Sequence, residues 1–240
     1  MGIVSQKYKP GDFSEGQWHE TLVTLGKLGF SPQMADLVAN SKSGKAREIV
    51  KICGGNPYAD LVADWEKFYE KRGINVDFSG LAIPESREGF RHIFVPKGMT
   101  PQGGYDLCAT KSKCWKYCGD KSLNDVVARE DRTAEKGSYV ILVQDGVEPN
   151  EELKGKSADN LATMRISGNT LTEALVHEAK YNDETGQHLN LVNRNLCSGS
   201  RYSRGDVPLV RWDSGYSELH VSETLPLDAF GTLRSRKVVS

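Results

Sequence analysis

Apolar residues recur at helical spacing in the first third of the chain. Trp18, Leu22 and Leu25 repeat at intervals of three and four residues, and Ser14 with Gln17 forms a capping-box pattern ahead of them. This pattern predicts a helix. Three more helices are expected: one from Ser31 with Pro32 in its first turn, one over residues 45–53 before two glycines, and one over residues 58–72 that ends at Gly73.

The helix predicted over residues 58–72 has the longest apolar face. Such a face most commonly packs into a core. Several short helices cannot cover every apolar face by themselves, so a homo-oligomer formed through the N-terminal helices is an alternative. The residues of the face are Leu61, Val62, Trp65, Phe68 and Tyr69.

From about Ile74 the pattern changes to short apolar runs separated by turns. Strands are expected at residues 76–83, 90–96 and 138–145, and the unbroken apolar run of the third predicts burial on both faces. Thr170 and Glu173 then cap a helix that Gly186 ends. Four further strands are predicted, at residues 190–196, 207–212, 217–222 and 233–240.

Helices first and strands later predict an α+β fold. We expect a helical N-terminal extension over residues 1–73 and a mixed domain of short antiparallel strands over residues 74–240.

Alternation along the strands after residue 206 predicts a two-faced hairpin. Side chains two residues apart share one face of a strand. The turn is expected at Asp213, Ser214 and Gly215. The back of the hairpin is then a scaffold of Val210, Trp212, Leu219 and Val221, and the front carries Leu209, Arg211, Asp213, Tyr216, Glu218, His220 and Ser222.

Charge and hydropathy exclude several classes of partner. The chain has 31 lysines and arginines against 32 aspartates and glutamates, so no overall field favours nucleic acid or an anionic membrane. The N-terminus lacks the apolar run of a secretion signal, and no window has the roughly 18 apolar residues of a membrane span. We expect a cytoplasmic protein without membrane insertion, with surface display through a partner as an alternative.

The cysteines and one tripeptide are candidate sites of chemistry. Five cysteines include a C-x5-C-x3-C run without a CxxC pair, which indicates reduced thiols and no metal or other cofactor. A cysteine hydrolase that uses Cys197 or Cys108 with a histidine is the alternative function. Residues 148–150, Glu-Pro-Asn, match the calcium and sugar tripeptide of C-type lectins, but no second oxygen-rich strand follows at the required distance.

The front of the hairpin has the composition of a binding surface. Tyrosine provides contact area at low entropic cost, and Ser, Gly, Asp and Arg provide adaptable hydrogen bonds. Lysine is missing from residues 181 to 236, as expected where ordering a long side chain would cost binding energy.

Long strings of the chain resemble one protein family. NLCSGSRYSRGDVPLVRW, the hairpin that follows it and LRSRKVVS resemble the variable region of proteins diversified by diversity-generating retroelements, in the form found in candidate-phyla bacteria. VDFSGLAIP, GSYVILVQDGVEPNEELKGKSADNL and LTEALVHEAKYNDETGQHLNL resemble the body of that group, so the resemblance covers roughly residues 60–240. The better-known members have a Gly-Gly-Ser-Trp type motif where this chain has CSGSR at 197–201.

The resemblance implies a C-type-lectin-like fold with a hypervariable region over about residues 197–232. In such proteins, adenine-directed mutagenic reverse transcription changes AAC-type codons, which do not become codons for Trp, Glu, Gln or Lys, so Trp212 and Glu218 are implied to be fixed. We therefore predict a non-catalytic binding protein for a macromolecular ligand, expected to be a protein. The implied ligand-binding residues are Tyr202, Arg204, Asp206, Leu209, Arg211, Asp213, Ser214, Tyr216, Ser217, His220 and Ser222.

Overall fold

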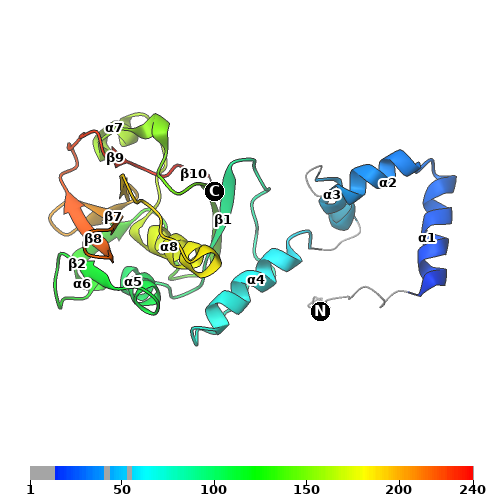
Figure 1. The fold of residues 1–240 in the computed structure, drawn as a ribbon, viewed down its shortest axis with the longest axis horizontal. Helices are drawn as coiled ribbons and strands as arrows, with labels where there is room; N and C mark the ends of the chain where they lie inside the picture. Colours follow the sequence, from blue (N-terminus) through cyan, green and yellow to red (C-terminus); the bar gives the residue numbers. More distant parts are fainter. Residues whose placement is uncertain (1–13, 41–43, 53–55, 240) are drawn as a thin grey trace. The chain divides into compact units, whose positions relative to one another are not determined.

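A computed structural model describes residues 14–40, 44–52 and 56–239 of the chain (Figure 1). The chain divides into two compact units, Met1–Asp64 and Trp65–Ser240. Among the described residues the architecture is mixed α and β, with helices first and small sheets afterwards, as the patterning predicts.

Among the described residues, three short helices lie entirely within the first unit. They are α1 (Glu15–Lys27), α2 (Pro32–Ala39) and α3 (Lys45–Ile52). The capping box of Ser14 and Gln17 is present, and the Ser31 side chain accepts a hydrogen bond from Met34 N, so the predicted starts of α1 and α2 are confirmed. The glycines expected to end α3 lie outside the described residues.

The second half of helix α4 (Ala59–Glu70) belongs to the core of the second unit. Trp65, Phe68 and Tyr69 are at most 2% exposed, and their rings pack on one another and on Phe78 and Phe94. The Tyr69 hydroxyl donates to the carbonyl of Phe94 at 2.8 Å. The interpretation of this apolar face as core is therefore confirmed for these three residues.

A three-stranded antiparallel sheet has the order β1 (Phe90–Val95), β4 (Tyr139–Gln144) and β10 (Val238–Val239). The four central residues of β4 are at most 6% exposed, which confirms a strand buried on both faces. The strand predicted over residues 76–83 is wrong: the segment turns at Gly80, whose φ is +71°, and Phe78 buries its ring without any strand pairing.

A five-stranded sheet has the order β2, β8, β7, β5, β9. The predicted hairpin is confirmed as β7 (Val207–Asp213) paired antiparallel with β8 (Glu218–Thr224). The outer strands β2 (Cys114–Lys116) and β9 (Leu233–Arg234) run parallel to their neighbours. Of the strand predicted over residues 190–196, only β5 (Arg194–Leu196) forms.

The terminal strand predicted over residues 233–240 is divided into β9 and β10, which belong to different sheets. Between them the side chain of Arg236 is buried and donates to the backbone carbonyls of Gly146 and Val147 at 2.9 and 2.8 Å. The chain crosses from one sheet to the other at this buried guanidinium, so the predicted strand is interrupted there.

Helices α5 (Pro101–Ala109) and α8 (Leu171–Thr185) cover the back of the five-stranded sheet. The predicted cap of Thr170 with Glu173 and the left-handed Gly186 bound α8, as expected. The two helices approach closely because position 104 is glycine: a Cβ there would lie 3.0 Å from that of Leu175.

Helix α7 (Ala158–Thr163) covers one half of the opposite face, the front of the same sheet. A short 3-10 helix, Glu151–Leu153, precedes it, and α6 (Leu123–Val126) leads into a two-stranded sheet of β3 (Val127–Glu130) with β6 (Ser200–Tyr202). The core under α7 consists of Leu153, Ala158, Leu161, Leu196, Val207, Leu209 and Leu233.

Candidate ligand-binding face

The half of the front that α7 leaves uncovered is formed by β2, β8 and β7. Trp115 is paired with His220, and His220 with Arg211, so these three side chains form one row across the strands. In the neighbouring row, Glu218 pairs with Asp213. We call this surface, together with the turn after Asp213, the open face.

Three aromatic rings lie together on the open face. The ring centroids of Trp115 and His220 are 5.0 Å apart, and those of His220 and Tyr216 are 6.0 Å apart with an interplanar angle of 22°. Trp115 is 43% exposed and Tyr216 is 69% exposed. The open face therefore presents aromatic area to solvent, which protein-binding surfaces commonly use.

Charged groups flank the rings. Glu218 lies 2.8 Å from Lys113 Nζ and 2.9 Å from His220 Nε2, and the hydrogen bond from Lys113 lowers the pKa of this carboxyl. Desolvation tends to raise the pKa of Asp213, but hydrogen bonding from Gly215 N–H and the nearby Arg211 guanidinium hold it below its ordinary value. Both carboxylates are thus ionised at neutral pH.

Nine of the eleven predicted ligand-binding residues are exposed or partly exposed: Arg204, Asp206, Arg211, Asp213, Ser214, Tyr216, Ser217, His220 and Ser222. The expectation that the other two also face solvent is wrong. Leu209 lies on the predicted side of β7 but is 1% exposed, because α7 packs over it. Tyr202 is 2% exposed, with its ring 4.7 Å from that of Tyr117.

The predicted scaffold residues lie on the back of the hairpin. Val210, Leu219 and Val221 have no measurable exposure. Trp212 is half-buried, and its ring stacks on that of His188 at 3.4 Å between centroids. The apolar back of the hairpin is therefore confirmed, whereas its front is polar only over the half that α7 leaves uncovered.

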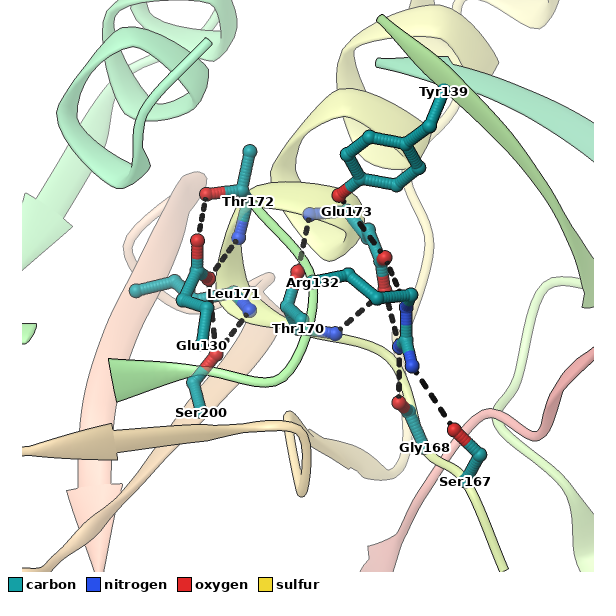
Figure 2. A network of polar contacts seen from close by, with 10 residues as sticks. All are labelled: Glu130, Arg132, Tyr139, Ser167, Gly168, Thr170, Leu171, Thr172, Glu173 and Ser200. Atoms are coloured by element: carbon teal, nitrogen blue, oxygen red, sulfur yellow. Dashed lines mark hydrogen bonds and ion pairs between the residues drawn. The ribbon is translucent and has the colours of Figure 1, made fainter. Parts of the chain in front are cut away.

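A buried polar network attaches the start of the implied variable region to α8 (Figure 2). One oxygen of Glu130 accepts hydrogen bonds from Thr172 N and the Ser200 hydroxyl, both at 3.0 Å, and the other accepts from the Thr172 hydroxyl at 2.6 Å. The Ser200 oxygen in turn accepts from Leu171 N at 2.8 Å. Burial raises the pKa of Glu130. The network joins β3, β6 and the N-terminus of α8.

The second half of this network is an ion pair around Glu173, whose side chain has no exposure. Arg132 reaches both of its oxygens, with Nε at 2.6 Å and Nη2 at 2.8 Å, and the Tyr139 hydroxyl donates to it at 3.1 Å. Arg132 also donates to the Ser167 hydroxyl and the Gly168 carbonyl (Figure 2). These contacts join the segment before β4 to the first turn of α8 and to the residues that precede it.

The two thiols considered for a hydrolase lie in surroundings that disfavour a thiolate. Cys108 and Cys197 are buried, and burial raises the pKa of both thiols far above the ordinary value. Cys108 Sγ donates to the carbonyl of Leu175 at 3.2 Å. Nucleophilic cysteines have lowered pKa values and basic neighbours. The imidazoles of His188 and His220 instead contact carboxylates, those of Glu178 and Glu218.

The Glu-Pro-Asn tripeptide at residues 148–150 accepts hydrogen bonds from the backbone of two other segments of the chain. The carboxylate of Glu148 accepts hydrogen bonds at 2.9 Å from the backbone N–H groups of Val192 and Asn193. The side-chain oxygen of Asn150 accepts from Lys237 N at 3.0 Å. Over the described ranges, no cluster of three or more His, Cys, Asp or Glu residues is arranged to hold a metal ion.

Sequence reasoning missed the contribution of β2 to the open face. The strand has only three residues, too few for a periodic pattern, and its single signal is alternation in KCWKY, which places Lys113, Trp115 and Tyr117 on one side. Parallel pairing with β8 brings Trp115 beside His220, which lies 105 residues further along the chain.

No protein-family model matches the chain, and no curated protein and no solved structure matches it either. In the part of the chain that the structure describes, none of the helices combines the length and apolar character required to cross a bilayer.

Proposed function

We propose that the chain is a non-catalytic ligand-binding protein that displays a retroelement-diversified surface on a C-type-lectin-like scaffold. The observation that carries the proposal is the pairing of β7 with β8. It places Val210, Leu219 and Val221 in the core and Arg211 and His220 on the open face. A surface of this kind tolerates substitution, because exposed side chains contribute little to stability.

The ligand that we propose is a protein. The open face is part of a sheet surface, whereas small-molecule sites are concave and mostly apolar. Tryptophan, tyrosine and arginine, which the open face carries as Trp115, Tyr216 and Arg211, are residue types enriched in protein interfaces. Nine of the eleven residues implied by the family resemblance reach solvent, and they come from the hairpin and the turns beside it.

The DNA around the gene provides the first test. We expect a reverse-transcriptase gene nearby and a near-repeat of the 3′ end of the coding sequence. The repeat should differ from the gene at adenines, and the differences should fall in the codons of open-face residues such as Arg211, Tyr216 and His220. A locus without the reverse transcriptase and the repeat would contradict the proposal, as would differences confined to codons of buried residues.

Self-association through the N-terminal helices is a separate proposal. In α1 and α2 no residue is buried, and Leu22, Leu28 and Met34 are 56%, 80% and 48% exposed. Exposed apolar area of this kind favours association. Light scattering of the full chain should show an oligomer that Leu22→Glu with Leu28→Glu converts to a monomer. A monomer in both cases would contradict the proposal.

A further inference from the structure

We propose that Lys113 and Trp115, which lie outside the implied variable region, form a constant anchor on the open face that binds a carboxylate and an adjacent apolar side chain of a protein partner. This inference rests on the proposed function and deepens it. The variable side chains would then choose among partners, and the constant anchor would recognise the feature that those partners share.

The position of Trp115 supports this role. Its pairing with His220 continues the row of the variable hairpin onto β2 without a gap, and the two ring centroids are 5.0 Å apart. With 43% of its surface exposed, Trp115 still offers area to a ligand. Tryptophan is among the residues most enriched at energetically dominant positions of interfaces. A ligand that covers His220 and Tyr216 therefore also contacts Trp115.

The backbone of β2 holds the anchor in place independently of the variable side chains. Leu219 N donates to the carbonyl of Lys113 at 2.8 Å, and Tyr117 N donates to the carbonyl of Val221 at 3.0 Å. On the far side of the strand, Lys116 Nζ donates to Gln102 of α5 at 3.1 Å. Because these contacts use backbone atoms and the covered back of the sheet, replacing His220 or Arg211 leaves β2 in position.

Charge indicates the chemistry of the partner. An ammonium group has three donors, and Lys113 uses one on Glu218 at 2.8 Å, while its side chain remains 70% exposed and that of Glu218 only 9%. Lys116 lies on the covered side of β2 and Lys111 pairs with Asp183, so Lys113 is the lysine beside β2 that the open face presents. Its exposure and its two remaining N–H donors favour a carboxylate beside the apolar group that packs on Trp115.

A peptide panel tests the anchor. Peptides selected from a random phage-display library on the immobilised full chain would be synthesised, and their dissociation constants measured against variants. The anchor variants are Trp115→Ala, Trp115→Phe and Lys113→Glu, and the variable-residue variants are Arg211→Ala and Tyr216→Ala. Met164→Ala and Lys136→Glu are matched controls, because both residues are exposed and lie outside the open face. Thermal unfolding shows whether each variant is folded. If Trp115→Ala does not fold, Trp115→Phe and Lys113→Glu are used in its place.

We expect the selected peptides to be enriched in Asp or Glu next to an apolar residue. Trp115→Ala should weaken the binding of every peptide by about tenfold or more, as at interface hot spots. Lys113→Glu should weaken all of them, whereas each variable-residue variant should weaken only some. Peptides that depend on Arg211 or Tyr216 but not on Trp115 and Lys113 would overturn the anchor and leave the proposed function intact. Two outcomes would count against both the anchor and the proposed function. One is a panel of peptides whose binding is weakened neither by the anchor variants nor by the variable-residue variants, and the other is a library that yields no binding peptide.

Discussion

The carboxylate of Glu173 receives two hydrogen bonds from the guanidinium of Arg132, from Nε at 2.6 Å and from Nη2 at 2.8 Å, at a site where the glutamate has no exposure. Glu173 also caps α8, because its oxygen accepts from Thr170 N at 2.8 Å. The pair therefore connects the segment before β4 to the first turn of the central helix.

Removing one partner of this pair should destabilise the fold. Arg132→Ala leaves a buried carboxylate without its counter-charge, for which we expect a loss of about 3–5 kcal/mol in the free energy of unfolding. Arg132→Lys should give an intermediate loss, because an ammonium cannot match both oxygens as the guanidinium does. Urea denaturation measures both. A change below about 0.5 kcal/mol in the alanine variant, typical of surface substitutions, would contradict this role.

Glu130 should make stability depend on pH. Burial raises its pKa above the ordinary 4.5, so the folded chain holds the proton more tightly than the unfolded chain does. The resulting contribution to stability is complete below pH 4.5 and is lost as the pH rises through the raised pKa. Glu130→Gln should remove this part of the pH dependence of unfolding. The exposed Glu135→Gln is the control, and equal pH profiles for parent and Glu130→Gln would contradict the expectation.

The two faces of the hairpin should respond differently to mutation. Leu219→Ala removes a side chain without measurable exposure and should cost about 2–5 kcal/mol. Tyr216→Ala, at a residue that is 69% exposed, should change stability by about 0.5 kcal/mol or less. The triple replacement of Arg211, Tyr216 and His220 by alanine should also fold. Loss of cooperative unfolding in the triple variant would show that the open face is not an interchangeable surface.

Thiol labelling distinguishes binding from hydrolysis. Since burial raises the pKa of Cys108 and Cys197, iodoacetamide at neutral pH should modify either thiol only after denaturant is added. Mass spectrometry of the peptides measures the modification, with half-exposed Cys118 as an accessible comparison. Rapid labelling of Cys197 or Cys108 that is suppressed by His188→Ala or His220→Ala would instead favour a cysteine hydrolase.

Local signals were sufficient where neighbouring residues decide the structure. The cap of Thr170 and Glu173 marked the start of α8, and the alternation of Val210 with Arg211 predicted that Val210 lies on the apolar back of β7 and Arg211 on its front. The run at residues 76–83 has similar apolar content but no strand beside it, so its backbone turns at Gly80 instead. A strand needs a partner for its hydrogen bonds, and the partner is not encoded within the strand itself.

In the candidate site, too, local sequence signals and contacts with distant segments decide different features. Leu209 lies on the side of the strand that alternation predicts, yet α7, about fifty residues earlier in the chain, covers it. Trp115 lies in a strand too short to predict, yet it extends the surface that the hairpin begins. Both outcomes depend on elements distant in the sequence, so no window around either residue contains the information.

By itself, the amino-acid sequence determined the starts of α1, α2 and α8, the buried central strand β4 and the apolar back of the hairpin. Capping hydrogen bonds and the two-residue period of a strand act over a few neighbouring residues. Only the tertiary structure decided that α7 closes one half of the hairpin's front and that β2 extends the other half. Burial and strand pairing join segments far apart in the chain, and their outcome depends on which surfaces the whole fold brings together.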